Sequence, residues 1–158
     1  MEFKNTDVGS ILRIRRNLTI PEVGPQSAEC CGRIYEKAEE IGACVVGPWH
    51  FISHRLPKDI ETRFIVDFCL PISGITQVPN GDDIELDTLS DFYCASRTFE
   101  GSLHQLFEMG YQPLIEEINA VNLECSGESR EVYHTWEGPD SENNVVEIQF
   151  GLAATPKG

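Results

Sequence analysis

The side chains in this sequence best able to do chemistry are carboxylates inside strand-like segments. Glu147 lies in the run VVEIQFGL and Asp67 lies in the run RFIVDFCLPI, where apolar residues alternate with other types. Successive side chains of a strand point to opposite faces of its sheet. Each run therefore predicts one apolar face that packs on helices and a second face that carries the carboxylate.

Two further runs, PWHFISH and REVYHT, combine aromatic rings with another carboxylate. We expect these rings to share the second face, because exposed aromatic residues seldom gather beside carboxylates outside binding sites. An aromatic face attracts a cation by about 0.5 to 2 kcal/mol, and a carboxylate shielded from water adds a stronger Coulomb attraction. This mixture predicts a cleft for an apolar cation. Glu147 is the expected counter-charge, and the other expected ligand-binding residues are Tyr133, Trp49, Phe51, Glu131 and Asp67.

The same residues also have a plainer interpretation. A glutamate on the polar face of a strand is often a hydrated surface group, and Tyr133 can pack against a neighbouring strand without contacting any ligand. Both interpretations stay open at the level of sequence pattern.

Length and composition predict one cytoplasmic domain over residues 1–158. The chain has 158 residues, 41% of them hydrophobic, which is enough for one sizeable core. No apolar run approaches the roughly 18 residues that span a bilayer, and the N-terminal MEFKNTDVGS lacks the blocks of a signal peptide.

The cysteines and histidines do not predict a cofactor or a metal centre. The six cysteines are scattered without CxxC spacing, so we expect reduced and mostly buried thiols. A zinc site drawn from them and from the four histidines is the weaker alternative, because no ligand pair has the spacing of a metal site.

Charge excludes two classes of partner. The net charge is −14, and residues 81–158 carry nearly all of it, with three Lys or Arg against sixteen Asp or Glu. Such a surface repels phosphate backbones and anionic lipids and attracts cations. We therefore expect a small-molecule partner, with no direct nucleic acid and no membrane.

One pattern of elements occurs twice along the chain. Strand patterns at 11–20, 45–54 and 62–72 surround a helix at 27–41; strand patterns at 84–99, 129–136 and 144–153 surround a second helix that opens at Gly101. We expect the strand at 84–99 to be interrupted near Ser90 and Asp91, and the second helix to kink or break near Gly110 and Pro113. A turn is expected at Pro79, Asn80 and Gly81.

Laying one hairpin over the other puts Asp67 on Glu147 and Ser53 on Tyr133. The pattern predicts an α+β domain made of a tandem βαββ repeat with pseudo-twofold symmetry. Its repeats would cover about 8–75 and 82–154, with an antiparallel sheet, two helices on one face and the ligand cleft on the other. Two unrelated hairpins are the alternative.

Several of these runs resemble the motifs of GyrI-like (SOUL-type) domains. The resemblance lies in the segments GPWHFISH, FCLPI, FEGSLHQL, REVYHTW and VVEIQFGLA, in the family's order. It implies a βαββ tandem repeat whose cleft binds lipophilic and often cationic compounds, in some relatives as the effector-sensing part of AraC-type or MerR-type activators. It also implies that Glu147 is the buried counter-charge, that Tyr133 lies beside Glu131, and that Trp49 belongs to an aromatic wall.

The sequence departs from the family pattern at three positions. Leu103 and Ser53 stand where the family often has tyrosine, and Gly151 replaces a proline. These departures concern the shape of the ligand more than the fold.

Three functions are consistent with these features. The first is a stand-alone module that binds or sequesters lipophilic cations, since no segment is left for a DNA-reading helix-turn-helix. The second is a hydrolase of cyclopropane-bearing genotoxins, with Glu147 as general base and Tyr133 as its partner. The third is interaction with a protein, either DNA gyrase or a transcription regulator.

Overall fold

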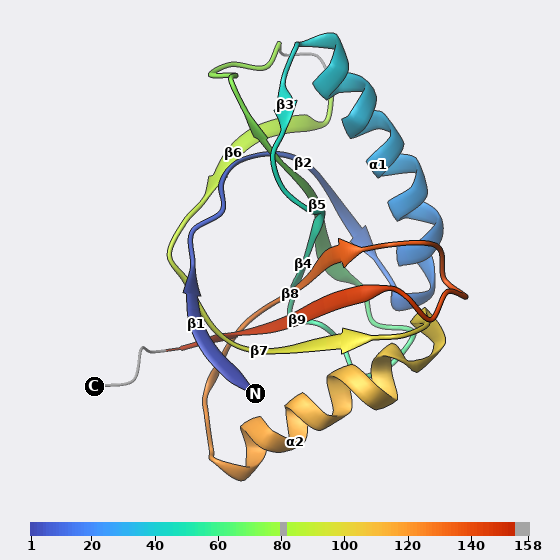
Figure 1. Cartoon of the computed structure of the whole chain (residues 1–158), viewed down its shortest axis with the longest axis vertical. Coiled ribbons are helices and arrows are strands. Elements are labelled where there is room, and N and C mark those ends of the chain that lie inside the picture. Colours follow the sequence, from blue (N-terminus) through green and yellow to red (C-terminus); the bar gives the residue numbers. More distant parts are fainter. Residues whose placement is uncertain (80–81, 154–158) are drawn as a thin grey trace. The chain divides into compact units, whose positions relative to one another are not determined.

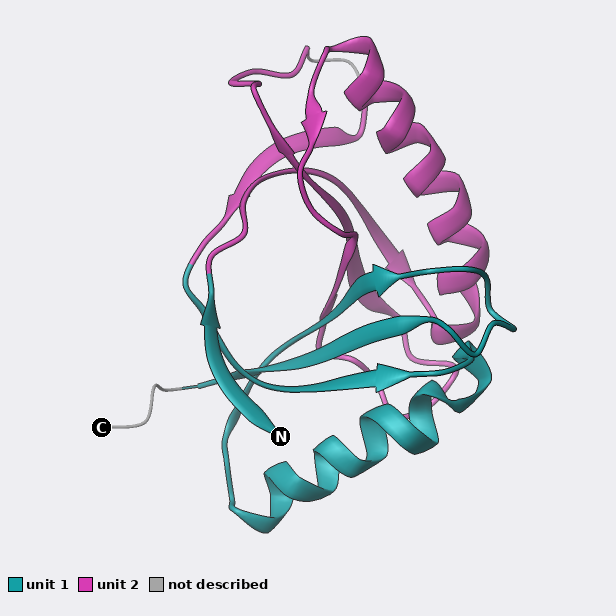
Figure 2. Cartoon of the chain, viewed as in Figure 1, with its two compact units in different colours: residues 1–6, 91–158 teal, residues 7–90 magenta. Residues whose placement is uncertain are grey.

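The computed structural model describes residues 1–79 and 82–153, and its chain forms two compact units. Unit 1 combines Met1–Thr6 with the segment that begins at Asp91, and unit 2 comprises Asp7–Ser90 (Figure 2). Asn80 and Gly81, where a turn was expected, lie outside the described residues. Each unit contains an antiparallel sheet and one long helical segment, so the α+β class is confirmed.

Unit 2 follows the predicted order of strand, helix and hairpin. The elements are β2 (Gly9–Leu18), α1 (Val23–Glu40), β3 (Cys44–Val45), β4 (His50–His54), β5 (Phe64–Ser73) and β6 (Ile84–Leu89), as Figure 1 shows. The strand order is β4-β5-β2-β6, and the short β3 also pairs with β5. All these strand pairs are antiparallel.

Helix α1 begins four residues before the predicted start. A 3-10 turn, η1 (Ile20–Glu22), leads into it, and the Glu22 carboxylate accepts hydrogen bonds from the backbone N–H and the hydroxyl of Thr19. Pro25 falls in the first turn of the helix, where a missing N–H costs no intrahelical bond. The proline therefore lies inside the helix start rather than ahead of it.

The core of unit 2 lies between α1 and one face of the sheet. The predicted inward residues of β5 are buried there together with residues of β2, against the α1 side chains Cys30, Ile34 and Ala38. The predicted apolar face of β5 is confirmed for Phe64, Val66, Phe68 and Leu70, and Ile72 extends it.

Unit 1 repeats the arrangement. Its elements are β1 (Glu2–Thr6), β7 (Phe92–Glu100), the 3-10 turn η2 (Leu103–Gln105), the π-helix η3 (Phe107–Tyr111), α2 (Gln112–Ala120), β8 (Cys125–Thr135) and β9 (Val145–Leu152). The strand order is β1-β7-β9-β8, and its pairs are antiparallel. The order β7, helix, β8, β9 confirms the second βαββ element pattern.

Each unit takes its outer strand from the chain that leads into the other unit. Strand β1 precedes β2 in sequence but pairs with β7, and β6 precedes β7 but pairs with β2. The predicted interruption near Ser90 and Asp91 is confirmed, because the boundary between the units falls there and Asp91 has a positive φ of 46°. The run 84–99 therefore forms two strands, one in each unit, rather than one strand.

The second helical segment changes its winding where a break was expected. Gly110 lies in the π-helix, and Pro113 lies at the start of α2, where its missing N–H is tolerated. The segment therefore stays helical from Phe107 through Pro113, with a change of hydrogen-bond pattern at Gln112.

The cysteines agree only in part with the expectation of mostly buried thiols. The six cysteines are thiols rather than disulfides in the described residues; Cys30, Cys69 and Cys94 are buried, but Cys44 and Cys125 are exposed. Burial raises the pKa of the Cys31 thiol to about 12 and that of Cys94 to about 11, which keeps both protonated at neutral pH. None of the helices in the described part of the chain has the length and apolar character to cross a membrane.

Candidate functional site

Strand register separates the predicted site residues of unit 1 into two sets. Glu131 lies opposite Ile148 and Tyr133 lies opposite Val146, whereas Glu147 lies opposite Val132. Residues directly opposite each other on paired strands share a face. The expectation that Tyr133 and Glu131 share a face with Glu147 is therefore wrong.

The same separation occurs in unit 2. Phe51 lies opposite Phe68 on the core side, with the two rings 4.9 Å apart in an edge-to-face arrangement, and Trp49 also packs against that core. Asp67 lies opposite Ile52 and so faces the other way. The predicted grouping of Trp49 and Phe51 with Asp67 is wrong for the same reason.

Glu147 is buried in a network of its own. Its side chain contacts the ammonium of Lys4, accepts a 2.7 Å hydrogen bond from the Gln149 amide, and lies 2.9 Å from His134 Nε2. Burial alone would raise the pKa of Glu147, but the hydrogen bonds from Gln149, Lys4 and His134 outweigh it and the pKa is lowered. Glu147 is thus an ionised carboxylate whose charge Lys4 already compensates.

Asp67 occupies the matching position in unit 2. Arg15 binds both of its oxygens at 2.7 and 2.9 Å, and His54 Nε2 lies 2.9 Å from Oδ2. Burial opposes ionisation, yet the hydrogen bonds from Arg15 and His54 lower the pKa of Asp67. The shift along the chain that relates Asp67 to Glu147 also relates His54 to His134, so the predicted superposition of the two hairpins holds for these pairs.

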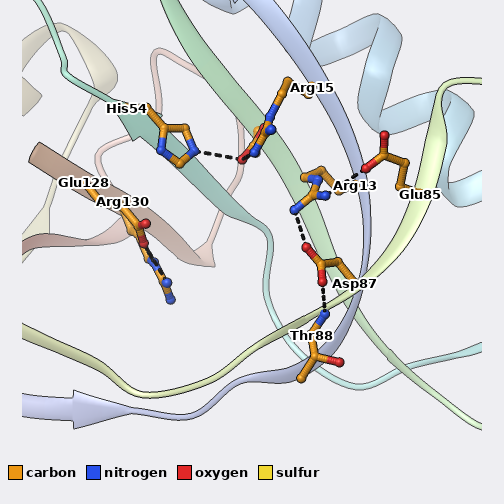
Figure 3. Close-up of polar contacts among 9 residues, drawn as sticks. Arg13, Arg15, His54, Glu85, Asp87, Thr88, Glu128 and Arg130 are labelled. Carbon is orange, nitrogen blue, oxygen red and sulfur yellow. Dashed lines mark hydrogen bonds and ion pairs between the residues drawn. The ribbon is translucent and has the colours of Figure 1, made fainter.

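Arg13 extends the polar face of unit 2. Figure 3 shows its guanidinium between Glu85 and Asp87, which it contacts at 2.8 and 2.6 Å. The charges on this face are therefore paired within the unit. Paired charges of this kind favour a structural role over recognition of a ligand.

Glu131 has a different environment, made of aromatic side chains. Tyr133 donates a 2.5 Å hydrogen bond to Oε1, and Tyr111 donates to Oε2. The Tyr133 ring meets Trp136 edge-to-face at 5.5 Å, and the Tyr111 ring meets Phe150 edge-to-face at 5.9 Å. Among the residues that the structure describes, no Lys, Arg or His lies within ion-pair distance of Glu131.

Burial and charge also act on Tyr111. The residue is only 8% exposed, and this burial raises the pKa of its phenol well above the ordinary value, with the neighbouring Glu131 carboxylate adding to the rise. Tyr111 is therefore a neutral hydrogen-bond donor at all physiological pH values. The cluster of Tyr111, Glu131, Tyr133 and Trp136 is the candidate binding site of unit 1.

The helical segment of unit 1 brings Tyr111 to this site. Leu106, Gly110 and Leu114 lie against the sheet, and the π-helix places Tyr111 beside them over β8 and β9. Four residues earlier, Phe107 is 62% exposed. The β8–β9 loop holds the other end of the segment, since Leu103 N–H donates to the Pro139 carbonyl at 2.9 Å.

Sequence reasoning missed Tyr111 and Trp136. Tyr111 was omitted because Gly110 and Pro113 predicted a break, although its four-residue spacing from Phe107 was a usable signal. Trp136 follows the Glu-x-Tyr run closely enough to have been included.

Trp49 has a partner in unit 2, because its indole N–H donates a 3.0 Å hydrogen bond to the hydroxyl of Tyr35.

Metal chemistry has no candidate in the described residues. No group of three or more His, Cys, Asp or Glu side chains there is arranged to hold a metal ion.

Comparison with known proteins gives the fold. No sequence-family profile and no curated protein matches the chain. The crystal structure of the EcmrR C-terminal domain is similar, with a TM-score of 0.69 and 14% identity over 98% of both chains. EcmrR in its complex with DNA, within EcmrR-RPo, gives 0.74 and 15% identity over 96% of this chain, which spans 57% of the EcmrR chain.

Two further structures share the fold. SAV2435 bound to tetraphenylphosphonium gives a TM-score of 0.57 and 12% identity over 96% of this chain and 94% of that one. A hydrolase from Listeria innocua gives 0.62 and 11% identity over 96% and 92%. The predicted GyrI-like fold is confirmed by these neighbours, and identities this low show the fold alone.

Proposed function

We propose that this chain binds lipophilic cations and that Glu131 supplies the counter-charge. The observation that carries the proposal is a carboxylate hydrogen-bonded by two phenols, beside the rings of Tyr133 and Trp136, with no cationic partner among the described residues. The proposal moves the counter-charge from Glu147, because Lys4 already compensates that carboxylate. The tetraphenylphosphonium in the SAV2435 structure is a ligand of the proposed class in a similar fold.

The magnitudes favour a cation over a neutral ligand. A unit charge about 4 Å from a carboxylate near a protein surface gains roughly 4 kcal/mol, and each aromatic face adds about 0.5 to 2 kcal/mol. Phenols lack a formal charge, so they position the Glu131 carboxylate without cancelling it. An apolar ligand without charge would gain only the contact with the rings.

Calorimetric titration with tetraphenylphosphonium tests the proposal. The wild-type chain should bind, and Glu131→Gln should weaken binding at least about tenfold, since it removes most of the Coulomb attraction. Glu116→Gln is the matched control, because it removes the same charge from an exposed position of unit 1 and should change affinity little.

Two results would contradict this assignment. If tetraphenylphosphonium does not bind to the wild-type chain, the proposed cation-binding function is wrong. Loss of affinity in Glu147→Gln but not in Glu131→Gln would return the counter-charge to Glu147. The roles of Trp49, Phe51 and Asp67 as ligand contacts stay predictions, which single substitutions in the same titration can check.

Hydrolysis is the second candidate, and the structure changes which residues could perform it. Glu147 and Tyr133 lie on opposite faces of the sheet and cannot act on one bond, whereas Glu131 and Tyr133 are hydrogen-bonded. A similar fold occurs in the Listeria hydrolase. Turnover of a cyclopropane-bearing compound that Glu131→Gln abolishes would support catalysis, and stoichiometric binding without product would exclude it. Interaction with gyrase or a transcription regulator stays a prediction.

A further inference from the structure

Gly110 lies at a close contact between the helical segment of unit 1 and its sheet. A Cβ atom on this residue would lie 2.7 Å from Ile148 Cδ1, 3.3 Å from Leu106 Cδ1 and 3.3 Å from Phe99 Cβ. Ile148 and Phe99 are buried in β9 and β7, so neither can move into solvent. A side chain at position 110 therefore requires the helical backbone to retreat from the sheet or the core to repack.

How closely the backbone at Gly110 approaches the sheet determines where the Tyr111 side chain lies. Tyr111 follows Gly110 in the π-helix, packs edge-to-face on Phe150 and donates its hydroxyl proton to Glu131 Oε2. Hydrogen bonds between oxygens extend over only about 2.5 to 3.0 Å. A retreat of the segment by about 1 Å would therefore break the bond between Tyr111 and Glu131.

The hydrogen bond from Tyr111 determines which acceptor sites of the Glu131 carboxylate a ligand can use. With Tyr111 on Oε2 and Tyr133 on Oε1, each carboxylate oxygen already accepts a phenol proton. Each oxygen keeps one further lone pair, so a ligand with N–H groups finds half of the acceptor sites already used, whereas a cation without N–H groups needs only proximity to the charge. The site is therefore suited to quaternary or phosphonium-type cations rather than to primary ammonium ions.

We propose that Gly110 is a positioning residue that holds Tyr111 on Glu131 and thereby makes the site prefer cations without N–H donors. The preference rests on the proposed cation-binding function, whereas the positioning of Tyr111 does not. Gly110 itself need not contact the ligand. It acts by allowing the helical segment to lie close against β7 and β9.

The first test needs no ligand. Ultraviolet titration of tyrosinate in the wild-type chain should show a late step well above the ordinary range, and Tyr111→Phe should remove that late step. Gly110→Ala should move the step toward the ordinary range, with circular dichroism verifying that the fold persists. The double variant Gly110→Ala/Ile148→Val removes the Cδ1 atom that the new methyl group meets, and it should restore the late step.

Gly32→Ala is the matched control. Gly32 lies in α1, and a Cβ atom added there would meet no other atom within 4 Å, so its substitution should leave the tyrosine titration unchanged. An unchanged late step in Gly110→Ala would overturn the positioning role. Failure of the double variant to restore the step would show that contact with Ile148 does not set the depth of the segment.

The second test measures preference with two matched cations, benzyltrimethylammonium and benzylammonium, as competitors of tetraphenylphosphonium. The wild-type chain should prefer the trimethyl compound. Tyr111→Phe and Gly110→Ala should shift the ratio of affinities toward benzylammonium by about fivefold or more, because each frees one acceptor site of the Glu131 carboxylate. An unchanged ratio would overturn the preference. If the wild-type chain binds none of these cations, the proposed function is wrong, and the tyrosine titration alone tests whether Gly110 positions Tyr111.

Discussion

Replacing Glu147 by glutamine tests whether this carboxylate is a structural ion-pair partner. Glu147 is 5% exposed and contacts Lys4, His134 and Gln149, so the substitution removes the charge that compensates Lys4. Removing one partner of a buried ion pair costs about 3 to 5 kcal/mol. The Lys4 side chain is 32% exposed and can regain water, which places the expected loss nearer about 2 to 3 kcal/mol.

The loss should depend on pH. The pKa of Glu147 is lowered in the folded chain, so its contribution to stability is complete above its ordinary pKa of 4.5 and disappears as the pH falls through the lower folded value. Glutamine does not titrate. The difference in unfolding free energy between wild type and Glu147→Gln should therefore be present at neutral pH and shrink below about pH 4.5.

Urea denaturation followed by circular dichroism at several pH values measures this difference. Glu85→Gln is the control, because Glu85 is an exposed partner of Arg13 and should contribute no more than about 1 kcal/mol. A loss below about 1 kcal/mol in Glu147→Gln, or a loss that stays the same at acid pH, would refute the ion-pair role. Tetraphenylphosphonium affinity should stay unchanged in every variant of this series that remains folded.

Three further outcomes are expected. Asp67→Asn should lower the free energy of unfolding by about 2 kcal/mol, and the loss should likewise vanish at acid pH because the pKa of Asp67 is lowered; a pH-independent loss in urea titrations would contradict this. Gly151→Ala should lower the free energy of unfolding by about 2 kcal/mol, since its Cβ would lie 2.5 Å from Ser126 Oγ and 3.0 Å from the Glu128 carbonyl oxygen. An unchanged melting temperature would show that strand β8 can shift to accommodate the methyl group. Trp136→Ala should weaken tetraphenylphosphonium binding severalfold with little loss of stability, because the residue is 47% exposed; unchanged affinity in calorimetry would exclude its ring from the site.

Local patterns predicted most elements of this fold, but not strand β1 (Glu2–Thr6). Alternation in β5 and helical spacing in α1 depend on neighbouring residues; alternation reproduces the observed core face of β5, and helical spacing places Ile34 and Ala38 in the core but misses Cys30. The exchange of outer strands could not be predicted, because β1 and β6 pair with strands that are remote in sequence. Alternation predicts a strand but not its partner.

The site was predicted less well because alternation within one strand does not determine register between two. Tyr133 and Glu131 share a face within β8, as expected, but that face is opposite the Glu147 side of β9. The pairing shifts between Tyr133 and Thr135, and one extra residue in such a pair reverses which side chains share a face. Tyr111 reaches the site through a π-helix, which helical spacing from Pro113 does not indicate.

A crystal structure of the chain with tetraphenylphosphonium would show which carboxylate faces the bound cation. We expect the phosphorus to lie within about 6 Å of the Glu131 carboxylate, with a phenyl group against the ring of Tyr133 or Trp136. A ligand bound beside Glu147 and His134, on the opposite face of the sheet, would refute the assignment of Glu131 as the counter-charge.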